Sequence, residues 1–149
     1  MSVLGTIRPN DWEFPLFLHV LGATLLFGAI FATAGVSIAS WRRPGVPALA
    51  RSAFWTLLTV AIPAWILMRG GAAWIYDKEG FSGDNDPTWV TVGLVAAEPG
   101  LLLLLLALGF AFWWQRSGKP VAGRVVAGLS SLYPVLLTVA WLAMSGKWG

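Results

Sequence analysis

The stretch from Phe14 to Ser40 reads FPLFLHVLGATLLFGAIFATAGVSIAS and contains no Asp, Glu, Lys or Arg. About 20 helical residues are enough to cross the hydrocarbon core of a bilayer, so this stretch predicts a transmembrane helix. The alternative is a cleavable signal peptide, because Ala32-Thr33-Ala34 has the small-x-small pattern of a cleavage site. A signal core is only about 7–15 residues long, which favours the transmembrane helix.

Three more stretches meet the same criterion, and the predicted spans lie at about 14–40, 52–76, 88–114 and 121–144. The chain has 149 residues, of which 57% are hydrophobic and 11% charged. That composition is too apolar for a soluble domain. Short loops make consecutive helices antiparallel neighbours. We therefore predict a single all-α domain over 1–149, a membrane four-helix bundle with up-down-up-down topology.

The charges between the spans predict the orientation. The first and third loops hold basic residues and no acid: Arg42, Arg43, Arg51, Arg116, Lys119 and Arg124. Six acids lie near the N-terminus or in the second loop: Asp11, Glu13, Asp77, Glu79, Asp84 and Asp86. Because positive loops stay in the cytoplasm, we predict a multi-pass protein of the bacterial cytoplasmic membrane with both termini outside. Orientation accounts for the basic residues, so no nucleic-acid partner is expected.

Tryptophans mark the ends of the same spans, as they do at membrane interfaces. The predicted outer set is Trp12, Trp74, Trp89 and Trp148, and the predicted inner set is Trp41, Trp55, Trp113 and Trp114. Asp86-Pro87 is typical of a helix N-cap followed by a first-turn proline.

Small residues recur at helical spacing in two spans and let helix backbones approach closely in lipid. The two stripes are Gly28, Ala32 and Gly35, and Gly123, Ala127 and Ser131. They predict contacts either inside the bundle or in a homodimer or larger membrane complex. The run Leu101–Leu106 has no small residue and is expected to face lipid.

Three ionisable residues fall inside the predicted spans, where charge is costly and often functional. His19, Arg69 and Glu98 are expected at roughly 8, 10 and 15 Å below the outer surface at about 1.5 Å per residue. Tyr133 reaches a similar depth. The functional interpretation is an outward-facing polar pocket within the membrane. Structural roles remain open: Arg69 snorkelling or pairing with Glu98, His19 bonded to a backbone carbonyl or to Glu98, and Tyr133 packed as a core aromatic.

Prolines near the middle of three spans, Pro63, Pro99 and Pro134, predict helix kinks. Each removes a backbone donor and leaves a carbonyl four residues earlier without its usual partner. In Glu98-Pro99-Gly100 a carboxyl group stands at the break itself. The kinks form the floor of the predicted pocket or serve packing alone.

Several chemistries lack the residues they need. The chain has no cysteine, which excludes disulfides, thiolate metal sites and thiol redox chemistry. One histidine is too few for a multi-histidine metal site. The sequence has no P-loop, dinucleotide fingerprint or nucleophile elbow. We therefore do not expect an enzyme.

The first span, with Leu18-His19-Val20-Leu21-Gly22-Ala23 and then Phe27-Gly28-Ala29, resembles small, uncharacterised bacterial membrane proteins with four helices. It is also similar to the opening helix of copper-resistance protein D membrane domains and related haem-associated families. The resemblance covers about a dozen residues. It implies copper handling or haem b, with His19 as an axial ligand of the iron. The chain departs from bis-histidine haem binding because it has one histidine. The iron would therefore be five-coordinate, or its sixth ligand would be Met68, Met144, Tyr133 or the His19 of a second copy.

The function that this reading favours is binding of haem b or another ligand, with a redox-accessory role. His19, Arg69 and Tyr133 are the expected cofactor-binding residues, and Glu98 with Arg69 an ion pair or titrating group. The first alternative is a small proton-coupled transporter or channel in which Glu98 titrates and Pro99 is a hinge. The second alternative is a structural or assembly subunit of a membrane complex.

Overall fold

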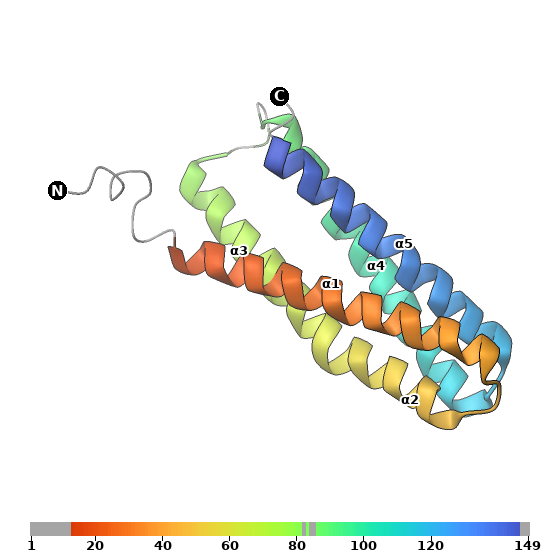
Figure 1. Cartoon of the computed structure of the whole chain (residues 1–149). Helices are drawn as coiled ribbons and strands as arrows, with labels where there is room; N and C mark the ends of the chain where they lie inside the picture. The colour runs from red at the N-terminus through yellow and green to blue at the C-terminus, as the bar shows by residue number, and fades with distance from the viewer. Residues whose placement is uncertain (1–12, 82, 84–85, 147–149) are drawn as a thin grey trace.

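The computed structural model describes residues 13–81, 83 and 86–146, and this part of the chain is helical without a strand. Three single helices are α1 (Glu13–Arg42), α4 (Thr88–Ser117) and α5 (Pro120–Gly146). With a fourth, segmented helix they lie side by side (Figure 1). The all-α prediction is confirmed. Asp11, Trp12, Asp84 and Trp148 lie outside the described residues.

The fourth long helix runs from Pro47 to Glu79 and changes its hydrogen-bond pattern midway. It comprises α2 (Pro47–Thr56), the π-helical turn η3 (Leu57–Ala61) and α3 (Ile62–Glu79). The π turn ends just before Pro63, which has no N–H for the regular ladder. Single π turns of this kind are local departures from the α-helical ladder that bend helices. The π turn ends two residues before Pro63, the position at which the sequence predicts a helix kink.

The helices extend beyond the predicted spans, and the turns between them are short. All four are long and apolar enough to cross a membrane. Helix α3 ends at Gly80 and α4 at Gly118, whose φ angles of 71° and 65° favour glycine. The prediction that Asp86 caps α4 is wrong, because the cap position is Pro87 and no side chain caps the helix.

The core is built largely from alanines with a few larger side chains, including Leu26, Ile30 and Leu57. Leu104 is also buried, so the expectation that Leu101–Leu106 faces lipid is wrong at this position. Trp114, near the C-terminal end of α4, is buried as well and packs on Gly123. Many large apolar side chains, among them Phe31 and Trp141, remain exposed on the outside.

Helices α1 and α3 approach most closely at Gly22 and Gly71, and neither residue belongs to the predicted stripe of small residues in the first span. A Cβ at Gly22 would lie 2.3 Å from the backbone nitrogen of Met68, and one at Gly71 would lie 2.6 Å from that of His19. Helices α1 and α3 therefore touch backbone to backbone. Gly28 and Gly35 have nothing within 4 Å of such a Cβ, which excludes an internal contact for that stripe.

The helices form two closely packed pairs, α1 with α3 and α4 with α5, while α1 also packs on α5. Helix α3 contacts α4 at few points, and it diverges from α4 and α5 towards its C-terminal end (Figure 1). We call the end that carries Glu13, Glu79 and Asp86 the acidic end. The opposite end, with Arg42 and Arg116, is the basic end. The divergence therefore opens towards the acidic end.

Candidate functional site

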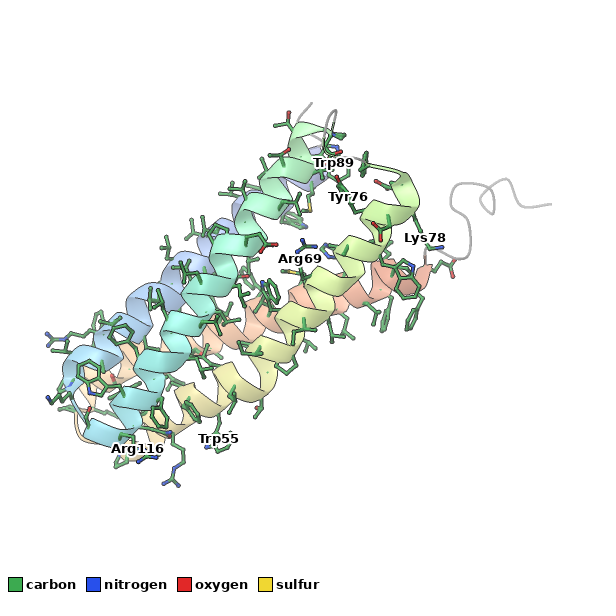
Figure 2. All side chains as sticks on the ribbon, turned by 180° about the vertical axis from the view of Figure 1, so that it is seen from behind. Trp55, Arg69, Tyr76, Lys78, Trp89 and Arg116 are labelled. Carbon is green, nitrogen blue, oxygen red and sulfur yellow. The ribbon has the colours of Figure 1, made fainter. Side chains whose placement is uncertain are left out.

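An ion pair joins α3 to α4 where these helices have few other contacts. The Nε atom of Arg69 lies 3.0 Å from Oε1 of Glu98, and the two side chains are 31% and 58% exposed. Figure 2 shows Arg69 extending from α3 into the space towards α4. Arg69 lies ten residues before the end of α3 and Glu98 ten after the start of α4. Both are therefore about 15 Å from the acidic end.

His19 of α1 is fixed against α3 beside this pair. Its Nδ1 atom lies 2.9 Å from the carbonyl oxygen of Met68, the residue before Arg69. A carbonyl can only accept, so Nδ1 donates this hydrogen bond, and in the neutral imidazole Nε2 is then the nitrogen with a lone pair. Gly22 and Gly71 permit this short approach of α1 to α3. The ring is partly exposed.

Trp65 makes a second polar contact between α3 and α4, which was not predicted from the sequence. Its Nε1 donates to the carbonyl oxygen of Ala97, 3.2 Å away and one residue before Glu98. Trp65 lies near the middle of the segmented helix Pro47–Glu79, whereas tryptophans in membrane proteins usually lie near the membrane interfaces. This unusual position in the sequence is the feature that could have indicated a specific polar contact.

A further polar contact, between Tyr76 and Asp86, lies near the acidic end. The hydroxyl of Tyr76 on α3 donates to Oδ2 of Asp86 at 2.6 Å, and the amide of Gly83 donates to Oδ1 at 3.1 Å. Phe81 contacts the rings of both Tyr76 and Trp89. Asp86 thus ties the connecting loop to α3, which is the role it has in place of a helix cap.

Two side-chain pairs, Arg69–Glu98 and Tyr76–Asp86, bound a region between α3 and α4 that we call the outer frame. Arg69 and Tyr76 are seven residues apart, so the frame is about 10 Å high along α3. His19 lies against α3 at this level. The structure therefore pairs two of the predicted site residues, Arg69 with Glu98, and holds a third, His19, against the residue before Arg69.

Tyr133, the fourth predicted site residue, lies in the core. It is 1% exposed, and its ring packs so tightly on α4 that a Cβ at Gly100 would overlap it. Its hydroxyl has no hydrogen-bond partner among the described residues. Pro99 and Pro134 both lie inside regular α-helices near this contact. Tyr133 thus lies in the core beside Gly100, and α4 continues as an α-helix through Pro99 and Gly100.

The chemistry of the outer frame is that of a hydrogen-bonding and charge-bearing site without a metal cluster. Among the described residues no group of three or more His, Cys, Asp or Glu side chains could hold a metal ion. The frame offers a guanidinium for an acidic group, a carboxylate for a proton or a cation, and one imidazole nitrogen as a ligand. No family model, curated protein or solved structure matches this chain.

Proposed function

We propose that this chain is a multi-pass protein of the bacterial cytoplasmic membrane, an up-down-up-down bundle with both termini outside. Four helices of sufficient length and hydropathy support it, as do the exposed apolar side chains along the bundle. The separation of acidic and basic ends supports the orientation, because basic loops remain in the cytoplasm.

Cysteine labelling tests the orientation, since the chain has no cysteine of its own. Thr88 and Ser117 are exposed at the two ends of α4. A membrane-impermeant maleimide should label Thr88→Cys in intact spheroplasts and Ser117→Cys only after permeabilisation. The reverse pattern would place the basic end outside and the outer frame in the cytoplasmic half.

Within this membrane setting, we propose that the outer frame binds a ligand that carries an acidic group. The observation behind the proposal is the accessible Arg69–Glu98 pair. Helix α4 has 30 residues and is about 45 Å long, against a hydrocarbon core of about 30 Å. If α4 is centred, the pair lies about 8 Å inside the hydrocarbon. Charged groups at such depth face protein, water or a ligand, since lipid cannot solvate them.

Haem b is the candidate ligand, because His19 and Arg69 supply two of the groups that would hold it, an axial nitrogen and a partner for a propionate. Donation from Nδ1 of His19 to the Met68 carbonyl leaves Nε2 as the ligating nitrogen, the usual arrangement for a metal-bound histidine. Arg69 would hold a propionate through a charge-assisted hydrogen bond. No second histidine exists in the chain, so His19 would be the single nitrogen ligand. The haem would supply one-electron chemistry, and the chain would bind and orient it.

Absorbance spectroscopy tests this proposal. Purified protein titrated with hemin should develop a Soret band, and His19→Ala should lose it because the axial nitrogen is gone. Arg69→Gln should weaken hemin binding by about 10- to 150-fold, since a charge-assisted hydrogen bond contributes roughly 1.5–3 kcal/mol. Exposed Arg124, at the basic end, offers the matched control Arg124→Gln, which should bind hemin normally. A protein that takes up no hemin would overturn haem binding and favour the transporter or assembly subunit.

A further inference from the structure

A groove between α1 and α5 lies away from the outer frame. It has a volume of about 470 Å³, within the roughly 300–1,000 Å³ typical of ligand sites. Helix α1 contributes Phe27, Phe31 and Gly35 to its walls. The two phenylalanine rings stack at 6.2 Å. A Cβ at Gly35 would meet nothing within 4 Å, so this glycine leaves the groove open.

The floor of the groove is polar, although its walls are apolar. Ser130 of α5 is 2% exposed and lines the groove. Its hydroxyl has no hydrogen-bond partner among the described residues. Pro134 also lines the groove, and it has no N–H to donate to the Ser130 carbonyl four residues earlier. The hydroxyl of this buried residue therefore has no partner in the described part of the chain, and its carbonyl lacks the amide donor that a helix normally supplies.

Unpaired polar groups are costly in this position. In the hydrocarbon region no water is available to satisfy a hydroxyl or a carbonyl, so protein or a ligand must do so. The outer edges of the groove carry exposed apolar side chains, including Val135 and Val139. Its occupant must therefore arrive from the lipid phase and present an apolar surface to the walls.

We propose that the groove binds a lipid-phase alcohol, with an apolar chain along Phe27 and Phe31 and one hydroxyl group directed to Ser130. The ligand hydroxyl can accept a hydrogen bond from the Ser130 hydroxyl, and it can donate to the Ser130 carbonyl, which Pro134 leaves without its amide donor. This proposal rests on the membrane setting and is independent of any ligand in the outer frame.

A matched pair of ligands tests the proposal. Phytol is an isoprenoid alcohol, and phytane is the same chain without the hydroxyl group. Tryptophan-detected thermal unfolding in detergent should show that phytol raises the Tm and binds about tenfold more tightly than phytane, as one hydrogen bond of ordinary strength implies. Ser130→Ala should reduce this preference. Equal binding of the two ligands, or no binding of phytol, would overturn the proposal.

Glycine replacements locate the site. Gly35→Phe fills the groove and should abolish the phytol effect. Gly109→Phe is the control, because Gly109 also has open space around its Cβ position and does not line the groove. His19→Ala should leave phytol binding unchanged, which separates this site from the outer frame. If Gly35→Cys forms a disulfide-linked dimer in membranes, a second copy occupies the groove and the proposal is wrong.

Discussion

Glu98→Leu is expected to destabilise the protein by up to about 3 kcal/mol, the upper limit being the cost of an arginine at the centre of a membrane helix. The replacement removes the carboxylate 3.0 Å from Arg69 and leaves the guanidinium without a counter-charge. Arg69→Leu should cost less, because an unpaired carboxylate can take up a proton and become neutral. Unfolding by SDS in mixed micelles, followed by tryptophan fluorescence, measures both changes.

The double replacement Arg69→Leu/Glu98→Leu is the control for this prediction. It removes both charges, so most of the stability lost in Glu98→Leu should return, as found when buried pairs are replaced by apolar residues. The double-mutant cycle then isolates the interaction between the two side chains. If Glu98→Leu is as stable as the unaltered protein, Arg69 reaches water or headgroups by itself. The ion pair then contributes nothing to the free energy of unfolding. That result would support the assembly-subunit alternative, which predicts that single replacements are tolerated.

Gly22→Ala is expected to cost about 1–3 kcal/mol, the usual range for overpacking, and to weaken hemin binding. The added methyl group would lie 2.3 Å from the Met68 backbone nitrogen and 2.7 Å from the Ala64 carbonyl oxygen. Neither backbone atom can move without shifting a helix, so α1 must separate from α3. His19 lies one turn from Gly22, and the separation would lengthen its hydrogen bond to the Met68 carbonyl.

Gly28→Ala provides the matched control on the same helix. Its methyl group would meet nothing within 4 Å. Alanine is also the better helix former by up to about 1 kcal/mol. The same SDS unfolding assay should therefore show unchanged or slightly raised stability and normal hemin uptake. Equal losses in Gly22→Ala and Gly28→Ala would mean that α1 meets α3 through a different face from the one described.

The polar site was predictable in its members, and two of its connections were among the alternatives that the sequence left open. These are the pairing of Arg69 with Glu98 and the hydrogen bond of His19 to a backbone carbonyl. His19, Arg69 and Glu98 stand out because charged or polar groups are rare within long apolar stretches. Their depths follow from counting residues along each helix. The partner of each group depends on how the helices turn towards one another. The hydrogen-bond acceptor of His19 is the Met68 carbonyl. The sequence cannot indicate which carbonyl this is, because every residue has a backbone carbonyl.

The amino-acid sequence by itself determined where the helices lie, which ends carry acids and which carry bases, and which residues are candidates for a site. These are properties of composition along the chain, and turn-forming glycines such as Gly80 and Gly118 mark their limits. Only the tertiary structure decided which face of each helix is buried. In a chain where core and outer surface are both apolar, hydropathy does not distinguish Leu104 from its exposed neighbour Leu105. The buried face is chosen by the shape of the neighbouring helix, which explains why Gly22 and not Gly28 meets α3.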